Sequence, residues 1–118
     1  MIESDERSNT PTQQERSMIA RIWHGYTSPA NADAYENLLK TTILPGIHRV
    51  AGYRGAYLLR REAGVEVEFV TVTLWDSMAA IRAFAGAEHD VAVIPEPAAK
   101  LLARYDARSV HYEASWCP

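Results

Sequence analysis

The stretch from Tyr53 to Trp75, YRGAYLLRREAGVEVEFVTVTLW, decides the fold class of this 118-residue chain. Its second half is rich in Val, Thr and Phe, which favour the pleated, half-buried surface of a strand. Glu62-Ala63-Gly64 lies in the middle of the stretch and supplies a turn. The pattern therefore predicts a β-hairpin, with one strand near residues 53–61 and the next over residues 65–75.

Helix signals lie on both sides of this hairpin. Downstream, Asp76-Ser77 caps a helix whose apolar residues recur at helical spacing until Gly86 interrupts it. Upstream, Ser28-Pro29 places an N-cap and a first-turn proline before a second apolar stripe. This second helix is expected over roughly residues 29–44, where Pro45-Gly46 ends it.

A strand is expected at each end of the folded region, over residues 18–26 and over residues 109–116. Residues 87–95 fit neither the helical nor the strand period, and a short helical turn is expected after them, through Leu102. The resulting order, β-α-β-β-α-β, is the ferredoxin-like arrangement within the α+β class. It predicts a four-stranded antiparallel sheet with both helices on one face.

The first strand is expected to present two different faces. One carries Met18, Ala20, Ile22 and His24, and the other carries Ile19, Arg21 and Trp23. We expect the face with His24 to meet the helices, and the face with Arg21 to be too apolar for water. A second copy of the chain is the expected cover, giving a homodimer whose two sheets close a barrel. Inside that barrel Arg21 would need a carboxylate partner, for which the candidates are Glu66, Glu68 and Glu113.

Composition excludes several classes of partner. The net charge of −3 argues against the basic face that nucleic-acid binding requires. Cys117 is the single cysteine, so no disulfide framework is expected and a reducing compartment is the default. No stretch approaches the roughly 18–20 apolar residues of a membrane span, and the N-terminus lacks the apolar core of a secretory signal. We therefore expect a cytoplasmic protein with no nucleic-acid or membrane partner.

The N-terminus and the rest of the chain differ in composition. Residues 1–17 are polar, charged and free of aromatic side chains, so they are expected to form a disordered tail. Residues 18–116 are expected to form one domain, the dimeric α+β barrel unit, because a chain of this length leaves little room for two.

Residues 18–114 resemble the antibiotic biosynthesis monooxygenase family of dimeric α+β barrels. The segments that carry the resemblance are Ala20–Trp23 (ARIW), Gly52–Arg61 (GYRGAYLLRR), Glu68-Phe69, Leu74–Ser77 (LWDS), Ala80–Gly86 (AIRAFAG), Pro95-Glu96 and Val110–Glu113 (VHYE). The resemblance implies a ligand pocket between the sheet and the helices of each subunit. It also implies oxidation of aromatic polyketides or quinol-like compounds with O2, without a metal or flavin.

One branch of this family instead binds and opens haem. Its pattern has an Asn on the first strand, a Trp on the second helix and a His ligand further along. At the matching positions this chain has His24, Phe84 and Ile94, and all three depart from the pattern. Ile94 cannot bind iron, although His89 lies nearby. The resemblance therefore favours the cofactor-free reaction over haem binding, and no cofactor is expected.

His24 is the candidate catalytic residue. On an otherwise apolar face, a neutral imidazole could accept a phenolic proton and so make an aromatic ring a better electron donor to O2. The alternative is a histidine that bonds a backbone carbonyl at the end of the strand. The chain contains no His-x-x-His, Glu-x-x-His or Cys-x-x-Cys spacing, so no metal site is expected.

The candidate ligand-binding residues are Trp75, Phe84, Tyr35, His89 and His111. Each has a structural alternative. The three aromatic residues could be core, His89 could be an exposed loop residue, and His111 could pair with a carboxylate at the dimer interface.

The leading prediction is a cofactor-independent monooxygenase-like protein that oxidises a small aromatic or quinol-type compound with O2. Two alternatives stay open. The first is a non-enzymatic dimeric module that binds a small hydrophobic ligand, and the second is a haem-binding or haem-degrading protein. The first alternative needs the same apolar walls as the leading prediction, so the sequence discriminates poorly between those two.

Overall fold

The predicted hairpin forms one side of the sheet in this computed structural model, which describes residues 18–116. Strands β3 (Tyr53–Ala63) and β4 (Glu66–Trp75) pair antiparallel around Gly64, whose φ is +71°. A positive φ is a conformation that glycine adopts without steric cost, so the turn and the hairpin are confirmed. The predicted tail over residues 1–17 and Cys117 lie outside the described residues.

Strand β2 (Ile19–Thr27) pairs with β4 on one side and with a divided edge strand on the other. Strand β5 (Leu102–Tyr105) pairs with the C-terminal end of β2, and β6 (Val110–Glu113) pairs with its N-terminal end. All pairings are antiparallel, in the order β3-β4-β2-β5. The sheet is therefore four strands wide, as predicted, but its fourth position is filled by two segments.

The strand over Leu102–Tyr105 was not predicted from the sequence, which places the end of a helical turn there. Helix α5 (Glu96–Ala99) is shorter than that expectation, and the chain then runs straight onto the edge of β2. There it forms hydrogen bonds with backbone groups of β2 that would otherwise have no partner. For example, the Asp106 amide donates to the His24 carbonyl at 3.0 Å.

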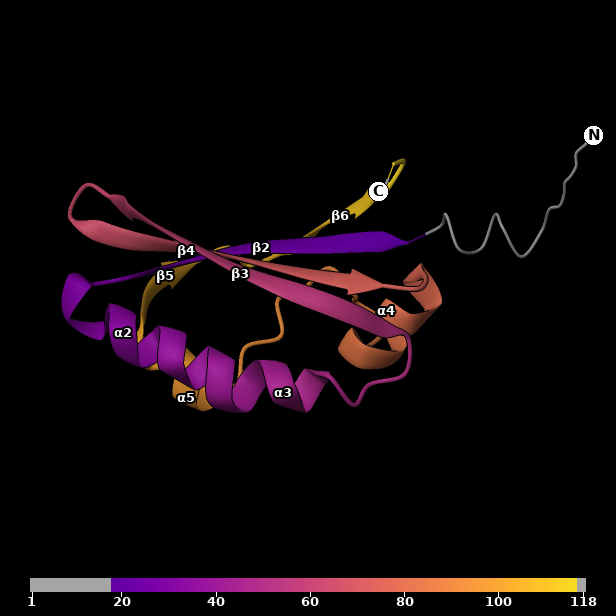
Figure 1. Ribbon diagram of the computed structural model, residues 1–118, viewed down its shortest axis with the longest axis horizontal. Coiled ribbons are helices and arrows are strands. Elements are labelled where there is room, and N and C mark those ends of the chain that lie inside the picture. Colours follow the sequence, from indigo (N-terminus) through magenta and orange to yellow (C-terminus); the bar gives the residue numbers. More distant parts are fainter. Residues whose placement is uncertain (1–17, 117–118) are drawn as a thin grey trace, which may run out of the picture.

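The helices lie on one face of the sheet, as Figure 1 shows. They are α2 (Pro29–Leu38), the π-helical turn η1 (Leu39–Ile43), α3 (Leu44–Ile47), α4 (Met78–Ala85) and α5. The two predicted caps are confirmed. The Ser28 hydroxyl accepts from the Asn31 amide at 3.3 Å, and the Ser77 hydroxyl accepts from the Ala80 amide at 3.2 Å. No helix within residues 18–116 is long and apolar enough to cross a membrane.

The first helical region continues past Pro45, although the sequence predicts that it ends there. A proline inside an α-helix lacks an amide donor, and its ring clashes with the carbonyl four residues back. Directly before it the helix widens into η1, where the Leu44 amide bonds the Leu39 carbonyl five residues back. The wider turn accommodates the proline ring, and α3 continues to Ile47.

The assignment of faces on the first strand was wrong. In the register of the sheet, Ile19 lies opposite Trp75, and Arg21 lies opposite Thr73. Trp75 is fully buried and packs with Ile81 of α4, so the face with Arg21 meets the helices. His24 belongs to the alternate set of side chains and lies on the uncovered face. Both sets are largely apolar, and the alternation alone does not reveal which side the helices cover.

Two clusters form the core between the sheet and the helices. One contains Ala32, Tyr35, Leu39, Val67, Phe69 and Ala98, and lies under α2 and η1. The other contains Ile19, Trp75 and Ile81, and lies under α4. Separate clusters on one face of a sheet leave space between them, and that space holds the candidate site.

Candidate functional site

Two small chambers lie between the sheet and the helices. They share Trp23, Ile47, Thr71 and Val93 as walls, so we treat them as one divided cavity. The Arg21 chamber, of about 60 Å³, extends to Arg21 and Phe84. The Tyr35 chamber, of about 70 Å³, extends to Tyr35, Leu39 and Ile43. A larger groove on the outer surface of α2 and α5 is open to solvent, and it does not enclose a ligand as the divided cavity does.

Arg21 is the charged wall of this cavity and is only 5% exposed. Nη1 donates to the His89 carbonyl, and it also lies 2.8 Å from Nε2 of His111, to which it donates a second hydrogen bond. Nη2 donates to the Val91 carbonyl at 3.1 Å. Burial lowers the pKa of Arg21, although the charge of Asp90 opposes that effect. The guanidinium therefore ties β2 to the loop after α4 and to β6.

Within residues 18–116, two polar atoms near the cavity are buried and have no hydrogen-bond partner. These are the Thr71 hydroxyl and Nδ1 of His89. Thr71 lines both chambers and stands beside Trp23 in the neighbouring strand. A buried hydroxyl without a partner costs stability, which is a reason to expect that a bound molecule completes it.

The aromatic residues predicted for the site separate into two groups. Tyr35 and Phe84 line the divided cavity, one in each chamber. Trp75 does not, because it lies behind Phe84, with ring centroids 5.1 Å apart, and its indole N–H donates to the Thr73 hydroxyl at 2.8 Å. Trp75 therefore has the core position that the sequence analysis kept as its alternative. Burial raises the pKa of Tyr35 to about 12, so its hydroxyl stays protonated near neutral pH.

His89 and His111 lie together beside the guanidinium of Arg21. Their ring centroids are 5.6 Å apart, and both residues bond the Arg21 guanidinium, His89 through its carbonyl and His111 through its ring. Arginine has no acceptor, so His111 must present a lone pair at Nε2 and carry its proton on Nδ1. Burial, followed by the charge of Arg21, lowers the pKa of His111, which favours this neutral form.

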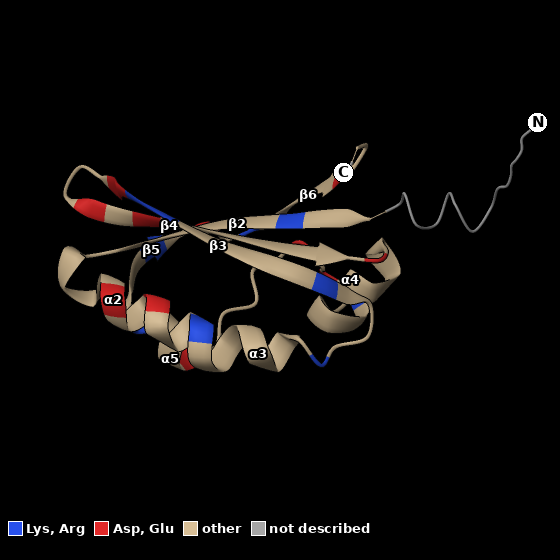
Figure 2. Ribbon diagram, in the orientation of Figure 1, with Lys and Arg blue, Asp and Glu red and all other residues tan. Residues whose placement is uncertain are grey.

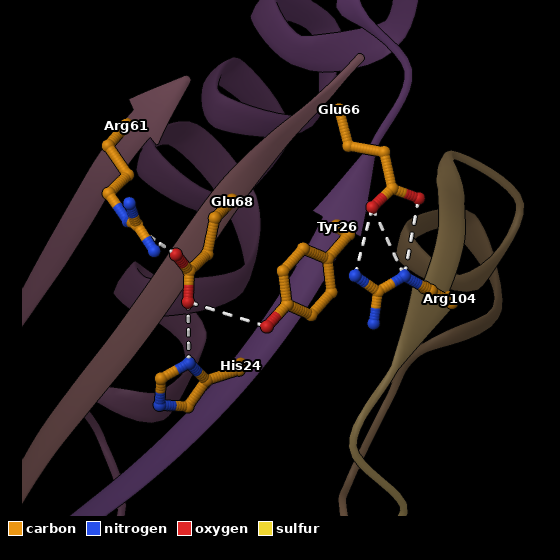
Figure 3. A network of polar contacts seen from close by, with 6 residues as sticks. All are labelled: His24, Tyr26, Arg61, Glu66, Glu68 and Arg104. Carbon is orange, nitrogen blue, oxygen red and sulfur yellow. Dashed lines mark hydrogen bonds and ion pairs between the residues drawn. The ribbon is translucent and has the colours of Figure 1, made fainter. Parts of the chain in front are cut away.

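His24 lies on the uncovered face of the sheet, away from the cavity. Figure 3 shows it within a polar cluster that also contains Tyr26, Arg61, Glu66, Glu68 and Arg104. Glu68 makes three of the hydrogen bonds in this cluster. It accepts them from His24 at 2.8 Å, from Arg61 at 2.6 Å and from Tyr26 at 3.4 Å. The predicted position of His24 beside a ligand in the pocket is therefore wrong.

Glu68 makes the stability of the fold dependent on pH. The hydrogen bond from His24, followed by that from Arg61, holds the pKa of Glu68 below its ordinary value of 4.5. A lowered pKa in the folded state contributes stability above the unfolded pKa, and this stability is lost as the pH falls through the folded value. Glu68→Gln is thus expected to cost about 2 kcal/mol of unfolding free energy near neutral pH.

The difference between wild type and Glu68→Gln should shrink when urea unfolding is repeated below pH 4.5. Glu62→Gln, at an exposed position of the neighbouring strand β3, is the matched control and should leave the unfolding free energy unchanged. A loss for Glu68→Gln that is constant with pH would contradict the role given to its charge.

The cavity residues that were not predicted from the sequence include Arg21, Trp23 and Thr71. The first two were assigned to the opposite face, and Thr71 was treated only as part of a strand. One signal was available, because Glu66 and Glu68 in β4 alternate with Val67 and Phe69. The acidic set is unsuited to the core, so Phe69, and Thr71 two residues on, must face the helices.

The chain matches the model of one protein family over most of its length. The model of the antibiotic biosynthesis monooxygenase family matches residues 18–106. A search of curated proteins finds no match. Among solved structures, a conserved protein from Methanosarcina mazei has a TM-score of 0.65 at 13% identity, covering 86% of this chain and 97% of its own.

Two further solved structures were determined with a bound ligand. The monooxygenase ActVA-Orf6 of Streptomyces coelicolor, in complex with nanaomycin D, has a TM-score of 0.54 at 18% identity, covering 84% of this chain and 88% of its own. The haem degrader MhuD of Mycobacterium tuberculosis, with two haems in its active site, has a TM-score of 0.56 at 20% identity, covering 85% of this chain and 98% of its own. At such identities the likeness establishes the fold alone.

Proposed function

Because the chain belongs to the antibiotic biosynthesis monooxygenase family, we propose that it oxidises a small, flat aromatic or quinol-type compound with O2 in the divided cavity. The observation that carries the proposal is the composition of the walls. Trp23, Tyr35 and Phe84 supply flat apolar surface, and Arg21 and Thr71 supply polar groups that can orient a ligand. Mostly apolar walls with a few placed polar groups are typical of small-molecule sites.

The size of the cavity excludes a ligand larger than a single ring. An apolar cavity of about 150 Å³ accepts benzene, whereas the two chambers hold about 60 and 70 Å³. Trp23 and Val93 stand in both chambers, so a change of either rotamer would join them. The π-helical turn also lines the Tyr35 chamber through Leu39 and Ile43, and such turns are frequent at functional sites.

The proposed reaction uses no bound cofactor, because the substrate supplies every electron. Loss of a phenolic proton makes the ring a better electron donor, and transfer of one electron to O2 followed by recombination joins dioxygen to a neighbouring ring carbon. Protonation gives a hydroperoxide, and loss of water across its C–H and O–O bonds leaves a carbonyl. One oxygen atom is retained and the other leaves as water. Apolar walls support this chemistry by excluding solvent from the intermediate.

The proposal assigns no proton transfer to His24, because that residue lies on the other face of the sheet. It also involves no metal. Among residues 18–116 no group of three or more His, Cys, Asp or Glu side chains is placed to hold a metal ion. Haem fits poorly, since no His, Cys or Met of the described part of the chain lines either chamber, and the raised pKa of Tyr35 keeps its phenol protonated.

The proposed working form is a homodimer that covers the open face of the sheet. Apolar residues on that face include Ala20, Ile22, Tyr57, Leu59, Val70, Val72, Leu74, Val110 and Tyr112. Tyr57 is 62% exposed and Leu59 50% exposed. In Figure 2 the acidic residues of the sheet lie mainly toward the end that holds the β3–β4 turn. A large apolar face of this kind supports packing against a second copy.

Binding without turnover is the second candidate function, and one observation favours it. Among the residues that the structure describes, no carboxylate or imidazole that could take the phenolic proton lines either chamber. Oxygen uptake separates the two candidates. An oxygen electrode should record consumption of O2 above the uncatalysed rate with methylhydroquinone if the chain is an enzyme, and none if it only binds the ring.

Val93→Phe is expected to weaken binding of methylhydroquinone at least tenfold, which is about 1.4 kcal/mol. Val93 is 48% exposed at the rim of both chambers, so a ring added there blocks access while the fold tolerates the change. Quenching of tryptophan fluorescence measures the affinity, since Trp23 is a wall of the cavity.

Val65→Phe is the matched control, because Val65 lies in the hairpin turn and is 86% exposed. It should bind the ring as wild type does. Equal affinity in Val93→Phe and wild type would mean that the ligand binds elsewhere, and the divided cavity would lose its proposed role.

A further inference from the structure

Arg21 is a buried cation whose hydrogen-bond partners are all neutral. Its acceptors are two backbone carbonyls and the neutral ring of His111. No carboxylate among residues 18–116 forms an ion pair with it. Asp90, the acidic residue of the adjacent loop, is instead paired with Arg108 at 2.8 Å. A buried guanidinium without a counterion is costly, so its retention in a cavity wall calls for an explanation.

The N–H groups of Arg21 that have no partner among the described residues belong to one edge of the guanidinium. Nη1 makes two hydrogen bonds and Nη2 makes one, which leaves Nε–H and one Nη2–H without a partner in the described part of the chain. Nε and Nη2 form the side edge of the fork, which binds an anionic oxygen through one or two parallel N–H donors.

The surroundings of that edge suit an aromatic anion. Phe84 lies 6.0 Å from the guanidinium carbon in the same chamber, and the unpartnered Thr71 hydroxyl lines it as well. Of the ionisable groups near Arg21, Asp90 acts on its charge from a distance but is ion-paired with Arg108 instead. His111 accepts its hydrogen bond as the uncharged ring, and the ring of His89 packs against His111 without touching a carboxylate.

We infer that the divided cavity binds its ligand as an anion, a single-ring aromatic whose ionised oxygen pairs with Arg21 and whose ring lies against Phe84 and Trp23. This inference rests on the proposed function and names the substrate class of the same site. In this inference Arg21 stabilises the phenolate that reacts with O2. The cavity therefore selects the ionised form of the ligand on binding, and no neighbouring base is required.

The test uses 4-nitrophenol, a single-ring probe whose phenolate is yellow and whose neutral phenol is not. The full chain is titrated into the probe across pH, and absorbance reports the ionised fraction. A cation in contact with an acidic oxygen is expected to lower the pKa of the bound probe by about one to three units. Arg21→Met should remove this shift or reverse it, because an apolar cavity favours the neutral phenol.

The methyl ether of the probe, 4-nitroanisole, has the same ring but cannot ionise. Binding of the ether together with an unshifted pKa of 4-nitrophenol on wild-type protein would overturn the inference and leave the proposed cavity intact. Failure of both probes to bind would overturn the cavity and the inference together. The wild-type measurement decides the matter even if Arg21→Met does not fold, and Arg21→Lys, which keeps the charge, should retain part of the shift.

Discussion

Replacing Val72 with glutamate is expected to separate the proposed homodimer into monomers. Val72 lies at the centre of the uncovered face, between Ile22 of β2 and Tyr57 of β3. In a dimer packed through that face, a carboxylate there would be buried without a partner, which costs about 3–5 kcal/mol. The dimer dissociation constant should therefore rise at least about a hundredfold. Analytical ultracentrifugation over a range of protein concentrations measures it.

Val65→Glu is the control for added charge, because it makes the same change in the exposed hairpin turn. It should leave the association state unchanged. A wild-type protein that remained monomeric at high concentration would mean that the open face stays in water, and the barrel would have to be abandoned. A Val72→Glu variant that still dimerised would place the interface on another surface.

The parts of the fold that could be predicted from the sequence are those with local causes. Ser28 and Ser77 bond amides three residues away, and Gly64 supplies a conformation that other residues adopt only with strain. Each signal is contained in a few neighbouring residues, so the helix starts and the hairpin could be found without knowledge of the tertiary structure. The edge strand β5 has no such local signal, since its reason to form is the free edge of β2.

The candidate site was harder to predict because its contacts are not local. Arg21 meets the His89 carbonyl and the His111 ring, which are 68 and 90 positions away along the chain. The alternation in β2 correctly separates Arg21 from His24, but it does not say which of the two meets the helices. That choice depends on the register with β4, where Trp75 anchors the buried face. A shift of one residue in this register exchanges the two faces of β2. It also decides whether His24 or Arg21 lies beside the cavity.

The two faces of the sheet therefore carry different polar clusters with different consequences. On the uncovered face, Glu68 is paired with Arg61 and also accepts a hydrogen bond from His24, so its charge is balanced within the chain. On the helix face, Arg21 has only neutral partners. A cluster that is complete by itself has a structural role, whereas one that lacks a counterion is the better candidate for a ligand site.

Replacing Trp75 with alanine is expected to cost about 3–5 kcal/mol of unfolding free energy. Trp75 is fully buried at the end of β4, where its ring contacts Tyr53 at 5.7 Å and Phe84 at 5.1 Å between centroids. The change leaves a large cavity behind Phe84 and frees the Thr73 hydroxyl from its indole partner. Since a domain has only about 5–15 kcal/mol in total, the variant should unfold at much lower urea concentration.

Trp116→Ala separates this effect from the loss of a tryptophan as such, because Trp116 is 79% exposed and its removal should change stability by no more than about 0.5 kcal/mol. Both variants must be measured by circular dichroism at one protein concentration, since dimerisation would otherwise contribute to the apparent stability. The contrast also tests the face assignment of β2, because Ile19 and Arg21 share the side of the sheet on which Trp75 is buried. If Trp75→Ala were as mild as Trp116→Ala, Trp75 would not lie in the core, and Arg21 would lose its place beside the cavity with it.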